Sequence, residues 1–312
     1  QQYLSTSASQ RATQLSLVAE VANAWLTLAA DRELLEIARQ TLATREDGLR
    51  LVQRRYDLGD ASALELSQSI ALVETARSDA ARYEANAQQD INALLVLAGG
   101  PVDAELLPAA LTEGVTGVAA LPAGVPGDVL LHRPDIMAAE HQLLAANANI
   151  GAARAAFFPS ISLTGSVGSA STELSGLFDG GTRAWSFVPT ISIPIFQGGR
   201  LRAGLGVANA DRDIALAQYE KSIQVGFQEV SDALVQQQSL GTQLQAQEAL
   251  VAASDRAEAL SQARYEAGLD SFTTLLDARR SAYAARQSLV STRLAEQSNQ
   301  VTLYKQLGGG WH

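Results

Sequence analysis

Few side chains in this sequence have the type and spacing needed for catalysis. The histidines are His132, His141 and His312, and the nine-residue step from His132 to His141 does not put two ligands on one helix face. Cysteine is absent, which excludes thiolate nucleophiles, thiolate metal sites and disulfides. Gly204-Leu205-Gly206 lacks the third glycine or the Lys-Ser/Thr pair of a phosphate-binding loop. We therefore expect no enzyme, no metal site and no cofactor.

One short motif occurs twice with polar residues that could form contacts. Arg55-Tyr56-Asp57-Leu58-Gly59 returns 209 positions later as Arg264-Tyr265-Glu266-Ala267-Gly268. A serine follows each glycine by three positions, and these are Ser62 and Ser271. The pattern predicts a tight turn with a left-handed glycine, then a helix that the serine caps. Each motif is therefore expected at the tip of a helical hairpin.

The helices that carry these tips are predicted from proline distribution and heptad spacing. All eight prolines lie between Pro101 and Pro194, so both ends of the chain can form long uninterrupted helices. Apolar residues repeat every seven positions in the first helix and in steps of three, four and seven in the second, as in a coiled coil. The first series is Leu28, Leu35, Leu42, Leu49 and Tyr56, and the second is Leu66, Ile70, Val73, Ala80, Tyr83, Ala87, Ile91 and Leu94.

The sequence thus divides into five expected segments. Residues 1–97 form a first long helical hairpin with its tip near 56–62, and 98–133 form a Pro/Gly-rich connector. Residues 134–158 form a helix, and 198–309 form a second long hairpin with its tip near 265–271. The fold class is mainly α, with one β-hairpin at 159–197.

That β-hairpin has the pattern of membrane strands. Apolar and small polar residues alternate over 160–169 and 185–195, about the length of a tilted transmembrane strand. The scarce aromatic residues gather near the strand ends, like the girdle of an outer-membrane barrel: Phe157, Phe158, Phe178, Trp185, Phe187 and Phe196. A soluble hairpin packed on a helix is the alternative, but narrow coiled-coil seams could not cover its apolar face. In a membrane, the open edges require other strands and hence oligomerisation.

Composition and charge agree with this architecture. Hydrophobic residues make up 47% of the 312 residues, aromatic residues only 5%, and no stretch of about 20 residues is continuously apolar. The net charge is −10 and lysine occurs only at 221 and 305, so nucleic-acid binding is not expected.

Several stretches are specific enough to suggest a family. They are Arg133-Pro134-Asp135-Ile136, the run 145–161 with Phe157-Phe158-Pro159-Ser160, and Pro194-Ile195-Phe196 before Gly198-Gly199. Over essentially its whole length the chain resembles the NodT/OprM-like branch of the outer-membrane factor family, which includes the TolC-like channels. The resemblance implies a homotrimer with a 12-stranded β-barrel and a periplasmic α-barrel. It also implies a role as the outer-membrane exit duct of a tripartite multidrug efflux system.

The partners implied by the resemblance are a periplasmic adaptor (membrane fusion) protein, an inner-membrane RND-type pump and outer-membrane lipid of a Gram-negative bacterium. One β-hairpin is present where the family has two, so a second hairpin and the lipid-bearing cysteine of a lipoprotein are expected before Gln1. A soluble or periplasmic coiled-coil adaptor or scaffold without a channel is the alternative function.

The resemblance also suggests site residues at the tips. Asp277 matches an acidic gate position of the TolC-like channels, Glu65 matches the corresponding acid of the first tip, and Thr274 replaces a second family acid. Solvated surface charges are the alternative for both acids. Tyr56 and Tyr265 are expected either to hydrogen bond across a closed periplasmic gate or to fill its core. The adaptor is expected to dock at the tip positions Gly59, Ser62, Gly268 and Ser271.

Overall fold

The computed structural model of the chain describes residues 1–111, 132–178, 180–181 and 183–309. Residues 112–131 of the expected connector and the terminal residues 310–312, which include His312, lie outside the described residues.

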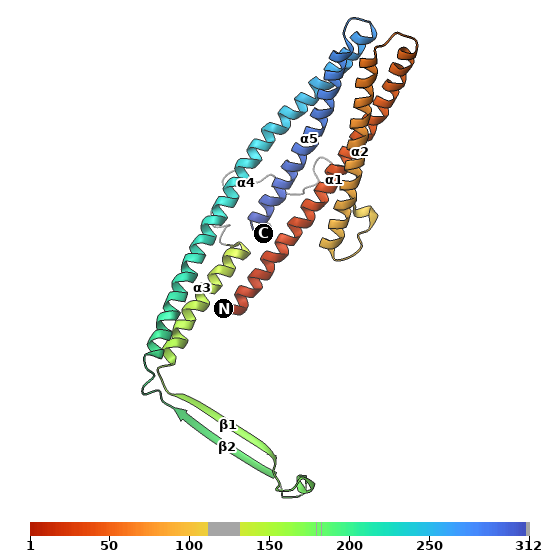
Figure 1. Ribbon diagram of the computed structural model, residues 1–312. Helices are drawn as coiled ribbons and strands as arrows, with labels where there is room; N and C mark the ends of the chain where they lie inside the picture. Colours follow the sequence, from red (N-terminus) through yellow and green to blue (C-terminus); the bar gives the residue numbers. More distant parts are fainter. Residues whose placement is uncertain (112–131, 179, 182, 310–312) are drawn as a thin grey trace. The chain divides into compact units, whose positions relative to one another are not determined.

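The chain is mainly α-helical (Figure 1). Its helices are α1 (Gln2–Asp57), α2 (Ala63–Ala98), α3 (Pro134–Ala155), α4 (Arg200–Glu266) and α5 (Phe272–Gln306). Its strands are β1 (Ser160–Ser169) and β2 (Arg183–Ser192), and short 3-10 turns occur at Ala104–Leu106 and Leu174–Gly176.

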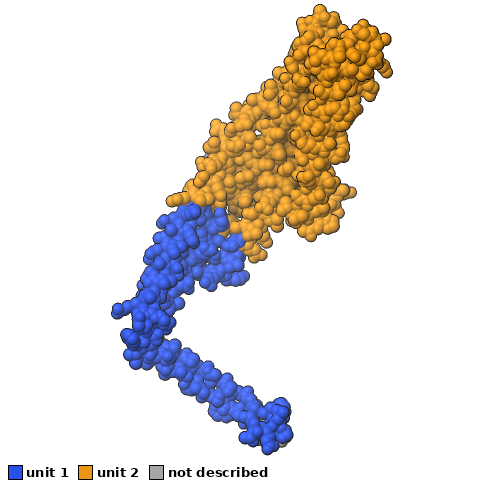
Figure 2. Space-filling view, in the orientation of Figure 1, with its two compact units in different colours: residues 1–9, 135–223 blue, residues 10–134, 224–312 orange. Residues whose placement is uncertain are grey.

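The chain forms two compact units, coloured separately in Figure 2. The first comprises Gln1–Ser9 and Asp135–Ile223, and the second comprises Gln10–Pro134 and Gln224–His312. This division differs from the expected segments, because α1 and α4 each contribute residues to both units. The reason is that no proline interrupts either helix, so a single helix continues from one unit into the next.

The two helical hairpins have the turn chemistry that the repeated motif predicts. Gly59 and Gly268 have φ values of 85° and 72°, which glycine adopts at little cost. Ser62 accepts a hydrogen bond from the Glu65 amide at 3.1 Å, and Ser271 accepts one from the Thr274 amide at 3.2 Å. Both serines are thus N-caps, and α2 and α5 begin one residue after them.

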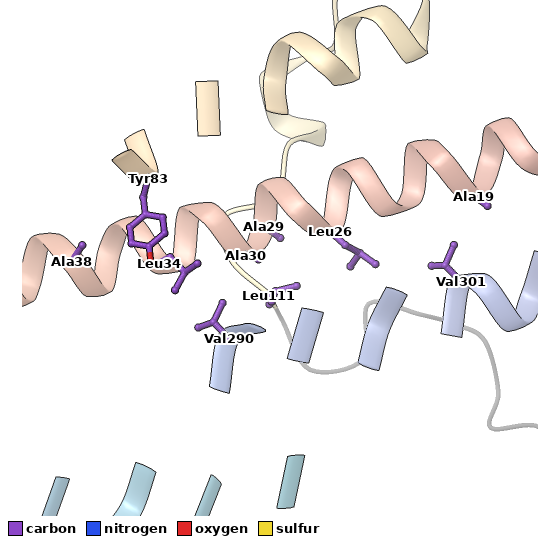
Figure 3. Close-up of a cluster of buried hydrophobic side chains, with 10 residues drawn as sticks. All are labelled: Ala19, Leu26, Ala29, Ala30, Leu34, Ala38, Tyr83, Leu111, Val290 and Val301. Carbon is purple, nitrogen blue, oxygen red and sulfur yellow. The ribbon is translucent and has the colours of Figure 1, made fainter. Parts of the chain in front are cut away.

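The main core of the second unit is built from small side chains. Figure 3 shows ten buried residues from α1, α2, α5 and the segment after α2: Ala19, Leu26, Ala29, Ala30, Leu34, Ala38, Tyr83, Leu111, Val290 and Val301. Alanine at four of these positions lets the helices approach closely. The high alanine content of the sequence therefore belongs largely to helix contacts.

The predicted leucine series of α1 lies on its packed side, but it includes only one of the two seam positions of each heptad. Leu28 is fully buried, yet Leu35, Leu42 and Leu49 are only partly buried, and Tyr56 is exposed. The more deeply buried residues lie three positions after each leucine, at the second seam position of a coiled coil. These are Ala38, Arg45 and Val52, while Asp31 at the same phase is partly buried. In α2, Ile70 was wrongly placed on the seam: it is 43% exposed, whereas Leu72 and Ala76 are buried.

The described part of the connector is fixed to α1 by hydrogen bonds. The indole of Trp25 donates to the Leu106 carbonyl at 2.8 Å, and Arg32 donates to the Pro108 carbonyl at 2.6 Å. Farther along, the buried Arg133 donates to Glu229 on α4 at 2.7 Å and to the Gln306 carbonyl at 3.1 Å. These contacts hold the ends of the connector against the long helices.

The β-hairpin pairs its strands in a register that separates two faces. Ile161 pairs with Ile191, Leu163 with Pro189 and Val167 with Trp185, so these apolar residues share one face. On the other face the Ser166 and Ser186 hydroxyls lie 2.7 Å apart, and Val188 is an apolar exception. β2 ends at Ser192 rather than at the expected Ile195, because Ser160 begins the partner strand and the following Pro194 cannot donate to a ladder.

Two carboxyl groups face each other between α1 and α2. Asp31 and Asp90 lie within hydrogen-bonding reach, and one oxygen of Asp90 is buried without a hydrogen-bond partner. Burial, followed by the charge of Asp31, raises the pKa of Asp90 to about 6. Burial likewise raises the pKa of Asp31. The pair therefore holds a proton at pH values where an exposed aspartate has lost it.

Asp90→Asn is expected to stabilise the protein at pH 8 and to have little effect near pH 4. In the unfolded chain Asp90 has a pKa near 3.8, so the folded state retains the proton longer and stability falls as pH rises through about 6. The full shift corresponds to about 3 kcal/mol, and solvent screening reduces it to about 1 kcal/mol. Melting temperatures at both pH values test this, with Asp103→Asn as an exposed control. An equal effect of Asp90→Asn at pH 4 and pH 8 would contradict it.

Candidate functional site

The candidate site lies where the two helical hairpins turn. The α1–α2 turn and the α4–α5 turn lie at the same end of the second unit, side by side at the top of Figure 1. Residues about 200 positions apart in the sequence make contact there. The local turn chemistry positions them, since each capped helix starts at a fixed distance from its glycine.

Three polar side chains join the hairpins, and we call Arg55, Glu65 and Tyr265 the tip cluster. The Tyr265 phenol donates a hydrogen bond to the Glu65 carboxylate and accepts one from Arg55. The guanidinium of Arg55 also lies 3.4 Å from Glu65 Oε1 and donates to the Asp60 carbonyl at 3.1 Å. Phe272 packs beside the Tyr265 ring at a centroid distance of 5.5 Å. At the tips, Tyr265 thus joins the second hairpin to the first.

Burial and charge keep this tyrosine in its donor form. Burial raises the pKa of Tyr265, and the hydrogen bond to the Glu65 carboxylate raises it further. The side chain of Glu65 is only 14% exposed, so its bond to the phenol is largely shielded from water. A shielded hydrogen bond to a charged acceptor is stronger than one between neutral groups. The cluster is therefore a strong but small contact between hairpins.

The two copies of the motif differ in what their arginine does. Arg55 reaches across to the other hairpin, whereas Arg264 stays within its own turn and pairs with Asp270 at 2.6 and 3.1 Å. The same pair lowers the pKa of Asp270. The prediction did not include either arginine as a site residue. Their recurrence in the duplicated motif was the signal that could have singled them out.

The structure brings together some of the predicted tip residues and not others. Glu65 and Tyr265 meet in the tip cluster, while Tyr56 is 42% exposed. Asp277 lies on the surface of α5 with its side chain 70% exposed, 3.8 Å from Arg280. Gly59 and Gly268 have open space where a side chain would be. Tyr56, Asp277, Gly59 and Gly268 are therefore accessible in a single chain.

A second set of hydrogen bonds joins α2 to α5 farther from the tips. The Tyr283 phenol donates to Asp79 at 3.0 Å, and Gln287 donates to the Tyr83 hydroxyl at 3.1 Å. Burial raises the pKa values of both Tyr83 and Tyr283, so both phenols remain protonated. Arg293 on α5 also lies 3.7 Å from Glu33 on α1, so the tip cluster is the outermost of several polar contacts between the hairpins.

The predicted girdle residues fall at different heights of the β-hairpin. Phe157 and Phe158 precede β1 and Phe196 follows β2, so they mark one end of the hairpin. Phe178 lies in the connecting loop, and Trp185 pairs with Val167 near that loop. Phe187 differs from the prediction because it pairs with Gly165 in the middle of the ladder, not at an end. Four of the six aromatic residues thus flank the strands, and Trp185 lies within β2 near its loop end.

The strands of this hairpin are exposed on both faces in the first unit. Every residue of β1 and β2 is exposed, including Leu163 at 66% and Ile191 at 66%. Over the ranges that the structure describes, no helix combines the length and apolarity needed to span a membrane. The described residues also contain no group of three or more histidine, aspartate or glutamate side chains arranged for a metal ion.

Comparison with known proteins identifies the family. The family model described as outer membrane efflux protein matches residues 1–100 and 125–309. This chain belongs to that family. Its members are transport proteins rather than enzymes. The toluene efflux pump outer membrane protein TtgF of Pseudomonas putida is 49% identical over 311 residues, which cover all of this chain and 64% of TtgF. The chain therefore spans about 64% of the length of that curated relative.

Solved structures of membrane proteins, including an outer membrane channel, share the fold. A membrane protein from Pseudomonas aeruginosa superposes with a TM-score of 0.89 at 44% identity, covering 99% of this chain and 70% of the other. The open-state MtrE outer membrane channel of Neisseria gonorrhoeae gives 0.84 at 41% identity, covering 99% and 69%. The predicted family and the mainly α fold with long hairpins are confirmed. The alternative, an adaptor or scaffold without a channel, finds no support in these names.

Proposed function

We propose that this protein is the outer-membrane exit duct of a tripartite efflux system. It would act as a homotrimer, with the β-hairpin as part of a 12-stranded barrel and the helical hairpins as part of a periplasmic α-barrel. The observation that carries the proposal is the β-hairpin, whose apolar face is exposed along both strands. An exposed face of this kind suits lipid, and the small polar residues of the other face suit an aqueous lumen. The names of the relatives support the same role.

In this mechanism the chain conducts passively and the helical tips form the gate. The tip cluster holds the second hairpin against the first, which favours the closed arrangement. A periplasmic adaptor bound near Gly59, Ser62, Gly268 and Ser271, together with an inner-membrane RND-type pump, would bias the tips toward opening. The adaptor can do so only by binding the open state more tightly than the closed one. Few polar contacts hold the tips together, so a modest difference in the adaptor's affinity for the two states is sufficient to open them.

The proposed cargo is small organic molecules delivered by the pump. Relatives are named for toluene, solvent and antibiotic efflux.

The decisive experiment is deletion and complementation in the host bacterium. Loss of the full-length protein is expected to raise sensitivity to solvents and antibiotics, and to leave adaptor and pump levels unchanged. Purified protein is expected to give discrete conductance steps in planar bilayers. Absence of conductance in correctly assembled protein would contradict the proposal.

Divalent cations are expected to block the channel mainly through Asp277. In a threefold assembly, three exposed copies of this carboxylate would attract cations, while Glu65 is engaged in the tip cluster. Asp277→Asn is expected to weaken the block about tenfold, and Glu65→Gln to weaken it less. The measurement is conductance against cation concentration, with Glu84→Gln on α2 as an exposed control. An unchanged block in both Asp277→Asn and Glu65→Gln would exclude both acids as the site.

A further inference from the structure

A cavity of about 290 Å³ lies between α1, α4 and α5, and Tyr283, which donates to Asp79, forms part of its wall. Three arginines line it, one from α1 and two from α5, and the carboxylate in its wall is Glu258. Neutral polar residues complete much of the α1 side: Gln40, Thr41 and Thr44. The cavity is unlike an apolar packing defect, because its wall is rich in hydrogen-bonding groups and positive charge.

The charges around the cavity do not balance. Arg286 is neutralised by Asp255 at 2.8 Å and by Glu258 at 3.4 Å. Arg45 and Arg279 have no carboxylate within 4.0 Å among the residues that the structure describes. Arg45 instead donates to the Leu72 carbonyl at 2.9 Å, and Arg279 donates to the Gln262 side chain at 2.5 Å. Two cations therefore share the cavity without a direct counter-ion.

Arg45 is buried and Arg279 is partly buried. Arg45 is only 6% exposed and stacks over the Tyr283 ring at 4.9 Å. Burial is the main cause that lowers the pKa values of Arg45 and Arg279, and the charge of Arg279 lowers that of Arg45 further. The carboxylates of Asp79 and Glu258 act on Arg45 only at longer range. Tyr283 cannot serve as an anion, because its pKa is raised. A buried charge without a partner is unfavourable in a folded protein.

We propose that this cavity binds a small oxyanion such as phosphate or sulfate between Arg45 and Arg279. A guanidinium has five N–H donors in a planar fork that fits oxyanions, and the described hydrogen bonds use one from each arginine. The volume leaves room for the anion and a few waters. Because Arg45 is on the first hairpin and Arg279 on the second, the anion would act as a removable tie between them.

The first experiment measures the melting temperature of the full-length protein as phosphate replaces chloride at constant ionic strength. We expect a saturable rise of about 5 °C at a hundred times the dissociation constant. Arg279→Gln is expected to lose the saturable part and keep only the general salt effect. Equilibrium dialysis with labelled phosphate is expected to find about one anion per protomer. An identical rise in the two proteins, or no bound phosphate, would overturn the proposal.

The second experiment supplies the counter-ion from the chain itself. A Cβ at Gly48 on α1 would lie 3.7 Å from Nη1 of Arg279, so Gly48→Asp places a carboxylate beside this cation without a severe clash. Gly48→Asp is expected to melt higher than the parent in chloride and to respond no further to phosphate. The isosteric Gly48→Asn is expected to retain the phosphate response. Equal phosphate responses in these two variants would overturn the proposal.

The same data separate a free anion from another source of negative charge. If a carboxylate of a second copy of this chain filled the cavity, the assembled protein would bind no labelled phosphate. Its melting temperature would then show only the general salt effect. Either observation would overturn a free-anion site. Failure of the site would leave the proposed efflux role untouched, since planar-bilayer conductance tests the pore itself whether or not an anion is bound.

Discussion

Leu163→Arg is expected to prevent assembly of the protein in the outer membrane, whereas Thr164→Arg at the next position is expected to assemble. Leu163 is 66% exposed and pairs with Pro189 on the apolar face of the β-hairpin. An arginine facing lipid near the bilayer centre costs about 2–4 kcal/mol, and a trimer would carry three. Thr164 lies on the opposite face, where a charge would contact water in the lumen.

The measurement is the amount of trimer recovered from outer-membrane fractions, followed by conductance of the assembled variant. Thr164→Arg is the matched control, because it adds the same side chain one residue away. It is also expected to change ion selectivity, since three positive charges would line the lumen. Recovery of Leu163→Arg trimer at the parent level would show that this face does not contact lipid.

Tyr265→Phe is expected to raise the open probability of the channel about tenfold or more. The substitution removes the phenol that joins Glu65 and Arg55 but keeps the ring that packs on Phe272. A hydrogen bond to a charged group contributes about 1.5–3 kcal/mol, and 1.4 kcal/mol is a tenfold change in an equilibrium. Single-channel recording in planar bilayers measures the change.

Tyr56→Phe is the matched control, because Tyr56 occupies the same motif position in the first hairpin and is exposed. It is expected to leave the open probability unchanged. Glu65→Gln should open the channel as well, and the double variant with Tyr265→Phe should add little, because both changes remove one contact. Fully additive effects of Tyr265→Phe and Glu65→Gln would show that the two residues act separately.

Local chemistry made much of this molecule predictable from sequence. The left-handed glycines and the serine caps follow from residues within a few positions of one another, and both were predicted correctly. The meeting of Glu65 with Tyr265 depends on how two separate hairpins pack, and no local pattern encodes that contact. The acids and tyrosines of the tips were predicted as site residues, but their partner Arg55 was not.

The cavity could not be predicted from the sequence for a related reason. Arg45 occupies a seam position at heptad spacing from Ala38 and Val52, where an apolar residue is the usual expectation. A series defined by leucines passes over such a residue. Arg279 and Arg286 resemble ordinary surface charges on a helix until α1 and α4 pack beside them and cover part of each side chain. Only the packing of three helices distinguishes a shielded cation from a solvated one.

The separation of about 200 residues between the partners at the tips has a consequence for biogenesis. Each hairpin closes through contacts between neighbouring helices, such as Arg45 with Leu72, and such contacts form quickly. The bond between Tyr265 and Glu65 must wait until the second hairpin has been synthesised and has docked on the first. Sealing of the periplasmic end is therefore expected late in maturation, after the helical rods already exist.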